Sequence, residues 1–217
     1  CCSLAYTIIC CGSGLKFKLY LATSILLQLA PKCIILAMTF LNNWHTSAPT
    51  LPECPSGMTT LMEIQTSLTA ALHQLDAEFS LQLLYLGETG FDQLFGGVGV
   101  SAFTVDSASS SVFFARDVLL CLDNIPVVWA RSFCRADAHA WHKVLNCGTR
   151  PLGEILFNDS FPLSRSAFEY ARLSPNTPLA GYDGGAVSAR RSAFSLEGNH
   201  LGLIEAFLPA LCTFITD

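Results

Sequence analysis

The chain has few charged residues and no basic segment. Only 13% of its 217 residues are Asp, Glu, Lys or Arg, and the formal net charge at pH 7 is −5. A nucleic-acid-binding face needs clustered Lys and Arg, often between aromatic side chains, and the sequence contains no such run. We therefore exclude nucleic acid as an expected partner.

A long uninterrupted apolar run is also missing. The stretches Leu19 to Ala30 and Cys33 to Leu41 are both shorter than the roughly 20 residues that cross a bilayer. Residues 1–57 also lack the basic start and single apolar run of a secretory signal. We interpret residues 1–57 mainly as upstream sequence translated in frame or as an extension outside the fold. Membrane contact through these residues is the less favoured alternative.

Several motifs of common enzyme classes are absent. The glycines at 96, 97 and 99 are followed by no Gly-Lys-Ser/Thr, and no Gly-x-Ser-x-Gly occurs, so neither a phosphate loop nor a serine hydrolase is expected. Asp137, His139 and His142 could approach a metal from one helix. Two histidines on an amphipathic helix are more typical of a solvated face, so we expect no metal and no cofactor.

The cysteines show no metal-binding or redox spacing. Six of the ten lie in residues 1–57, and the other four lie among apolar residues without a Cys-x-x-Cys motif. Such cysteines are typical of reduced core thiols, which indicates a cytoplasmic protein. These four are Cys121, Cys134, Cys147 and Cys212.

Charge and cysteine content both change near residue 57. Residues 1–57 hold three lysines and one glutamate, whereas residues 58–217 hold nine basic and sixteen acidic residues. This shift predicts a boundary between Pro52 and Gly57. We expect an N-terminal extension, 1–57, and one compact domain, 58–217.

The periodicity of the second part changes from helical to strand-like. Apolar residues recur at helical spacing from Thr59 to Phe79, and a turn is expected at Gly87 to Gly90. Antiparallel hairpins with flanking helices indicate an α+β fold. The expected later elements are strands 98–105, 112–122 and 127–133, helices 137–145 and 151–157, and a closing hairpin of strands 187–196 and 200–208.

Three charged side chains fall on apolar faces of predicted strands. Because side chains alternate with period two, Arg116, Arg131 and Glu205 each point among hydrophobic neighbours. A buried charge without a partner costs several kcal/mol, so each needs an ion pair or a polar ligand. A structural ion pair and an anion-accepting pocket both remain open. Two arginines exceed what one glutamate balances, and a dianionic small molecule would balance the excess.

Five short blocks occur in an order that resembles the signature of the chorismate pyruvate-lyase family. The resemblance covers about residues 60–211. The blocks are Arg116-Asp117-Val118-Leu119-Leu120, Ala130-Arg131-Ser132-Phe133, Arg150-Pro151-Leu152-Gly153-Glu154-Ile155-Leu156-Phe157, Arg190-Arg191-Ser192 and Leu203-Ile204-Glu205-Ala206-Phe207-Leu208-Pro209.

The resemblance implies an enzyme that converts chorismate to 4-hydroxybenzoate and pyruvate for ubiquinone synthesis. It implies that Arg116 holds the ring carboxylate and that Glu205 meets the 4-hydroxyl end. It also implies a ligand contact from the backbone of Leu152 and a place for Arg131 at the second carboxylate or on the route to it. Gly90 would give a backbone contact from a ligand-covering segment.

We accordingly expect a monomeric, cofactor-free lyase. One alternative is a non-catalytic domain of the same fold that binds aromatic acids, as in the effector domains of GntR-type regulators. Those domains follow a basic winged helix-turn-helix, which residues 1–57 do not resemble. A second alternative is an inactive, membrane-associated ligand carrier.

Overall fold

The computed structural model describes residues 44–48, 56–90, 92–95, 112–157 and 162–215. The helices are α3 (Ser56–Glu63), α4 (Leu68–Leu72), α5 (His139–Leu145) and α6 (Leu152–Leu156), with 3-10 helices η1 (Gln93–Phe95) and η3 (Pro209–Phe214). The strands are β1 (Phe79–Thr89), β2 (Phe113–Leu122), β3 (Ile125–Arg135), β4 (Ser164–Arg165), β5 (Glu169–Leu173), β6 (Val187–Leu196) and β7 (Asn199–Phe207).

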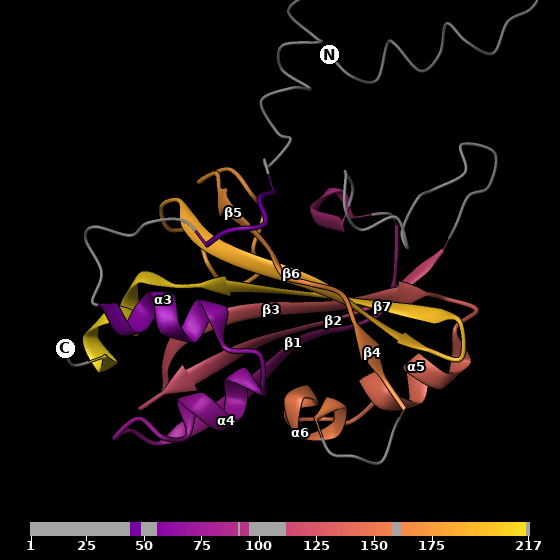
Figure 1. The fold of residues 1–217 in the computed structure, drawn as a ribbon, viewed down its shortest axis with the longest axis horizontal. Coiled ribbons are helices and arrows are strands. Elements are labelled where there is room, and N and C mark those ends of the chain that lie inside the picture. The colour runs from indigo at the N-terminus through magenta and orange to yellow at the C-terminus, as the bar shows by residue number, and fades with distance from the viewer. Residues whose placement is uncertain (1–43, 49–55, 91, 96–111, 158–161, 216–217) are drawn as a thin grey trace, which may run out of the picture. The chain divides into compact units, whose positions relative to one another are not determined.

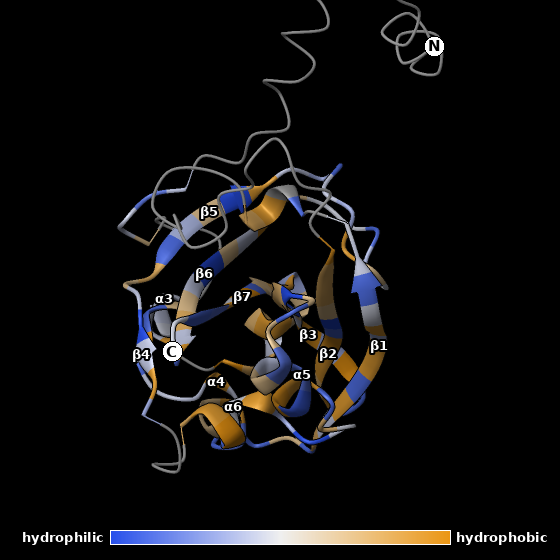
Figure 2. Cartoon of the chain, turned by 90° about the vertical axis from the view of Figure 1, so that its right-hand side faces the viewer, coloured by the Kyte–Doolittle hydropathy of each residue, from blue (hydrophilic) through white to orange (hydrophobic). Residues whose placement is uncertain are grey.

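These strands form one antiparallel sheet of seven strands. Their order is β1-β2-β3-β7-β6-β4, and β5 also pairs with β6 (Figure 1). The sheet is curved, and α4, α5 and α6 lie between its two edges (Figure 2). The α+β class expected from the sequence is confirmed.

Two tight turns fix the long hairpins of the sheet. Asp123 and Asn124 have φ values of 50° and 64°, and Glu197 and Gly198 have φ values of 51° and 78°. Two-residue turns with positive φ match the right-handed twist of paired strands, and Asp, Asn and Gly adopt this conformation most readily. Both hairpins expected from the sequence are confirmed. The strand expected at residues 98–105 lies outside the described residues.

The front of the domain differs from the expectation of a helical segment reaching Phe79. Helix α3 ends at Glu63, and α4 begins after Ser67, whose Oγ accepts a hydrogen bond from the Ala70 amide at 3.2 Å. This cap satisfies an amide at the start of α4 and so favours a new helix there. Strand β1 then runs through Gly87 to Thr89, where a turn was expected, because its backbone pairs with β2 as far as Phe113.

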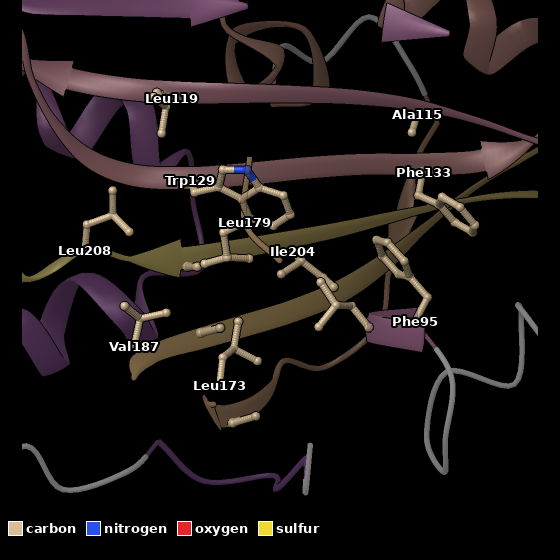
Figure 3. Close-up of a cluster of buried hydrophobic side chains, with 14 of the residues drawn as sticks. Phe95, Ala115, Leu119, Trp129, Phe133, Leu173, Leu179, Val187, Ile204 and Leu208 are labelled. Carbon is tan, nitrogen blue, oxygen red and sulfur yellow. The ribbon is translucent and has the colours of Figure 1, made fainter. Parts of the chain in front are cut away.

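The sheet is covered on both faces, which we call the helix face and the loop face. Helices α3 and α4 pack on the helix face near one end of the strands, and α5 and α6 pack toward the other (Figure 1). On the loop face, Trp129 and the stacked rings of Phe95 and Phe133, 4.7 Å apart, form part of a core that Leu173 and Leu179 complete (Figure 3). Burial on both faces explains the almost unbroken apolar character of β2 and β3.

The compact unit begins before residue 58. It comprises Asn42–Asp217, and His45 and Tyr170 exchange two backbone hydrogen bonds of 2.7 Å. The Trp44 ring also lies 4.2 Å from the Arg191 guanidinium carbon. These contacts extend the unit to residues that precede the expected start at residue 58. Among the described residues, no helix has the length and apolar character needed to cross a bilayer.

Among the described residues of this unit, Cys121, Cys134 and Cys147 are free thiols, as expected. Cys121 and Cys134 are buried, whereas Cys147 and Cys212 are partly exposed. Burial raises the pKa of Cys134 to about 12, and the nearby Asp137 carboxylate adds to this effect. Cys134 is therefore a neutral packing residue at ordinary pH.

Candidate active site

A cavity lies on the helix face, between the sheet and the helices α4 and α6. Hydrophobic side chains form most of its wall, and the polar side chains converge on it from β2, β3, β4, β6 and β7. Its lining comprises Thr66, Leu68, Thr69, Leu81, Arg116, Val118, Leu120, Ala130, Ser132, Leu152, Gly153, Phe157, Arg165, Phe168, Arg190, Ser192, Phe194, Leu203 and Glu205.

Arg116 lies on β2 at one side of this cavity and is only 2% exposed. Its Nη2 donates to the carbonyl oxygens of Gly148 and Arg150 at 2.8 and 3.2 Å, which directs the guanidinium toward the loop before α6. In the described part of the chain, Arg116 has no carboxylate partner and its buried Nε has no hydrogen bond. Burial lowers the pKa of Arg116, and Cys147 offsets this effect only in part. Arg116 is thus a buried cation that an anionic ligand would stabilise.

Glu205 lies on β7 directly opposite Arg190 of β6. The Arg190 Nε donates to Glu205 Oε2 at 2.6 Å. The Nη1 of Arg190 donates to the carbonyl oxygens of Leu61, Met62 and Ile64 at 3.3, 3.0 and 2.9 Å. These are carbonyls at and just beyond the last turn of α3, which otherwise lack partners within the helix. Arg190 therefore joins α3 to the sheet and holds the Glu205 carboxylate at the cavity wall.

Arg165 of β4 lies at the side of the cavity opposite β2. Its guanidinium carbon is 4.4 Å from the centre of the Phe168 ring, and the guanidinium carbon of Arg190 is 4.3 Å from the same centre. Its Nη2 donates to the exposed side chain of Gln65 at 2.7 Å. Burial, followed by the Arg190 cation, lowers the pKa of Arg165, while Glu205 partly offsets them.

The cavity wall carries an excess of positive charge. Arg116, Arg165 and Arg190 contribute three cations and Glu205 contributes one carboxylate. Glu205 is paired with Arg190, and the ion pairs formed between described residues include neither Arg116 nor Arg165. The formal balance of +2 suits a ligand with two negative groups.

Arg131, expected at the same site, lies on the loop face. Its Nε and Nη2 donate to Asp117 Oδ1 and Oδ2 at 2.7 and 2.6 Å, and its Nη1 is paired with Asp92. Burial alone would lower the pKa of Arg131, but the hydrogen bonds and charges of Asp117 and Asp92 raise it overall. Arg131 therefore does not line the cavity with Arg116, and its pairs with Asp117 and Asp92 match the structural ion pair that the sequence left open.

A β-bulge in the hairpin of β2 and β3 explains the position of Arg131. Leu122 pairs with Ile125 next to the Asp123-Asn124 turn. If the two strands continued to pair residue by residue from there, Arg116 would lie opposite Arg131. The register shifts by one residue between Leu120 and Cys121, so Arg116 lies opposite Ser132 and Asp117 lies opposite Arg131. A shift of one residue exchanges the faces of a strand. It places Ser132 at the cavity and gives Arg131 a carboxylate partner.

Leu152, the fourth expected site residue, lies at the cavity in the first turn of α6, where it is buried. A side chain at the adjacent Gly153 would approach Ser67 Oγ to 2.5 Å, so the glycine allows α6 to pack closely against the start of α4. Gly90 is exposed, follows the end of β1 and is not among the residues that line the cavity. The structure thus brings together Arg116, Leu152 and Glu205.

Sequence reasoning missed Arg190 and Arg165 as residues of the site. Arg190 could have been found from the sequence, because residue-by-residue pairing of the two strands outward from the Glu197-Gly198 turn places it opposite Glu205. Arg165 carries no comparable signal, since β4 has only two residues and reaches the cavity through its pairing with β6.

The candidate metal residues, Asp137 before α5 and His139 and His142 within it, do not converge. The rings of His139 and His142 meet edge to face, 5.9 Å apart, and His142 stacks on Phe114. Asp137 is paired with Arg135 at 3.0 Å. In the described segments, no group of three His, Cys, Asp or Glu side chains is placed to hold a metal ion.

The fold and cavity define a class of α+β protein with a small, mostly apolar cavity whose wall carries an excess of positive charge. Residues 41–214 match the chorismate lyase family, and the chain belongs to that family. A relative from Bordetella pertussis is 33% identical over 175 residues, which cover 74% of this chain and 88% of the relative. A relative from Pseudoalteromonas translucida is 33% identical, with coverage of 66% and 79%. Both are named probable chorismate pyruvate-lyase.

A third relative of that name, from Ralstonia nicotianae, is 39% identical over 113 residues, and the matched part spans 57% of its length. Among solved structures, the effector domain of PhnF from Mycobacterium smegmatis is similar with a TM-score of 0.43 and 11% identity, covering 69% of this chain and 90% of that one. The C-terminal domain of the histidine utilization repressor from Pseudomonas syringae has a TM-score of 0.42 and 14% identity, with coverage of 61% and 93%.

Proposed function

We propose that this chain is a chorismate lyase that converts chorismate to 4-hydroxybenzoate and pyruvate. The observation that carries the proposal is the charge of the cavity, where three arginines face one carboxylate inside a mostly apolar wall. Chorismate is a dianion with a hydrophobic ring, and it would balance that charge. Membership of the chorismate lyase family supports the same substrate.

Arg116 binds the ring carboxylate in this proposal. Its side chain is buried, held by two backbone carbonyls and without a carboxylate partner in the described part of the chain. A guanidinium binds a carboxylate with paired, charge-assisted hydrogen bonds, which are stronger in an apolar site than in water. Leu152 lines the wall near this end and would orient the ring through its backbone.

Glu205 acts at the opposite end of the ring, on the 4-hydroxyl group. During the reaction the ether bond at C3 breaks, the hydrogen at C4 departs, and the ring becomes aromatic. Enolpyruvate leaves and takes up a proton to become pyruvate. Glu205 is held by Arg190, so its carboxylate is in position before substrate binds. A positioned carboxylate can orient the hydroxyl group and exchange a proton with it.

Aromatisation provides the driving force, so the protein mainly positions the dianion and excludes water. The apolar wall, with Leu68, Leu81 and Phe157, supplies the exclusion. Fixed cations next to the breaking bond would stabilise the negative charge that develops on the departing enolpyruvate. The 4-hydroxybenzoate formed would serve as the aromatic precursor of ubiquinone.

The test is incubation of the purified full chain with chorismate. We expect 4-hydroxybenzoate, followed by its absorbance, and pyruvate, followed with lactate dehydrogenase and NADH, to form in equal amounts above the spontaneous rate. Tight binding of 4-hydroxybenzoate without turnover of chorismate would instead indicate a non-catalytic aromatic-acid-binding domain.

A further inference from the structure

One of the three arginines of the cavity wall neither binds the ring carboxylate in the proposed function nor pairs with Glu205. Arg116 accounts for the ring carboxylate, and Arg190 donates to Glu205 and to three carbonyls after α3. Arg165 is the remaining arginine of the cavity wall. Its hydrogen bond, to the exposed side-chain amide of Gln65, is one that water or a ligand can replace.

Arg165 and Arg116 approach the cavity from opposite sides. Arg116 is on β2 and Arg165 is on β4, with β3, β7 and β6 between them. Four strand spacings correspond to roughly 19 Å along the curved sheet, and both long side chains reach inward from these strands. A ligand between them therefore needs two negative groups that point in different directions.

Arg165 also lies near the end of the cavity where Glu205 is found. The guanidinium carbons of Arg165 and Arg190 lie 4.4 and 4.3 Å from the centre of the same Phe168 ring. Arg190 in turn holds Glu205. In chorismate, the ether that carries the second carboxylate is attached to C3, next to the carbon that bears the 4-hydroxyl group. A ligand with its hydroxyl group at Glu205 directs this second carboxylate toward Arg165.

We infer that Arg165 binds the carboxylate of the departing enolpyruvyl group and thereby distinguishes substrate from product. This inference rests on the proposed function. The rings of Phe168, Phe157 and Phe194, at 4.4, 5.5 and 5.9 Å, hold the guanidinium at the wall. Because 4-hydroxybenzoate lacks the second carboxylate, it leaves Arg165 without a ligand partner. After cleavage the second carboxylate belongs to pyruvate, so 4-hydroxybenzoate is bound through fewer contacts than chorismate.

The experiment compares two probes on the full chain. One is 4-hydroxybenzoate, and the other is 3-(carboxymethoxy)-4-hydroxybenzoate, an unreactive analogue with a second carboxylate on an ether at the same ring position. In Arg165→Gln, the Kd of the dianionic probe and the KM of chorismate should rise about ten- to a hundredfold, the effect of one lost charge-assisted hydrogen bond. The Kd of 4-hydroxybenzoate should stay within about twofold. Arg165→Lys should recover part of the loss.

Arg172→Gln is the matched control, since Arg172 is an exposed arginine of β5 that donates to Ser188 outside the cavity. It should leave both probes and turnover unchanged. Equal weakening of both probes in Arg165→Gln, or of neither, overturns the inference. If the unmodified chain does not turn over chorismate, the proposed function fails, and the ratio of the two probe affinities still tests Arg165 on its own.

Discussion

Arg190 Nε donates to Glu205 Oε2 at 2.6 Å across the adjacent strands β6 and β7, with both residues at least 90% buried. The same pair therefore supports the fold and presents a carboxylate to the cavity. A matching pair, Arg191 and Glu169 at 2.8 Å, lies on the loop face, away from the cavity. The two pairs allow the structural and catalytic contributions of Glu205 to be separated.

Glu205→Gln should lower turnover at least about a hundredfold, the lower range for loss of a positioned acid or base. It should also lower the free energy of unfolding by about 3 kcal/mol, because it breaks a buried ion pair. Glu169→Gln should cause a similar loss of stability with unchanged turnover. Urea unfolding and initial rates on the same preparations measure both effects. Wild-type turnover in folded Glu205→Gln would remove Glu205 from the mechanism.

Arg116 should increase the affinity for 4-hydroxybenzoate and, as a buried cation, lower the stability of the unliganded domain. Arg116→Lys keeps the charge but loses the planar fork, so it should weaken 4-hydroxybenzoate binding by about 1–3 kcal/mol. Arg116→Met removes a buried cation that has no carboxylate partner among the described residues. Gly148 and Arg150 are exposed, so water can replace its bonds to their carbonyls. Arg116→Met should therefore abolish binding while the unfolding free energy stays equal or rises. A large loss of stability would show that Arg116 is mainly structural.

Arg131 should be required for stability and not for ligand affinity. Arg131→Ala leaves the buried carboxylate of Asp117 and the partly buried carboxylate of Asp92 without their cation, which should cost about 3 kcal/mol. Arg135→Ala breaks an exposed pair with Asp137 and should cost at most about 1 kcal/mol. Isothermal titration with 4-hydroxybenzoate should give equal affinities for both folded variants. Selective loss of affinity in Arg131→Ala would place Arg131 on the ligand's route.

The segment around Trp44 should stabilise the domain. A chain of residues 42–217 should be more stable than one of residues 58–217 by about 2–4 kcal/mol, because the shorter chain loses the His45–Tyr170 backbone bonds and the Trp44–Arg191 contact. Trp44→Ala in the longer chain should account for part of this difference. Equal urea midpoints for the two chains would show that the domain is complete from residue 58.

Alkaline pH should destabilise the domain through Cys134. Its folded pKa of about 12 lies above the ordinary thiol value of 9.0, so the stabilising neutral form is fully present below pH 9. Between pH 9 and 12 the unfolded chain loses the proton first, and stability falls by up to about 1.4 kcal/mol per pH unit. Cys134→Ala should show a shallower decline in unfolding free energy over this range. An identical decline in both proteins would contradict the assignment.

The sequence by itself determined the antiparallel hairpins and the buried positions of Arg116 and Glu205. The period-two alternation of side chains and turns such as Asp123-Asn124 are local properties, so they can be recognised from the sequence alone. The pairing of Arg190 with Glu205 was also within reach, because their hairpin has no register shift. In these strands, local pattern and tertiary structure agree.

Only the tertiary structure decided which arginines meet in the cavity. The bulge between Leu120 and Cys121 exchanges the face of Arg131 relative to Arg116, and no side-chain pattern in either strand marks it. Arg165 reaches the cavity through the pairing of β4 with β6, which are far apart along the chain. Strand register and long-range pairing depend on how the two faces of the sheet are buried as a whole. A periodic pattern shows that a charge is buried, but the assembled sheet determines its partners.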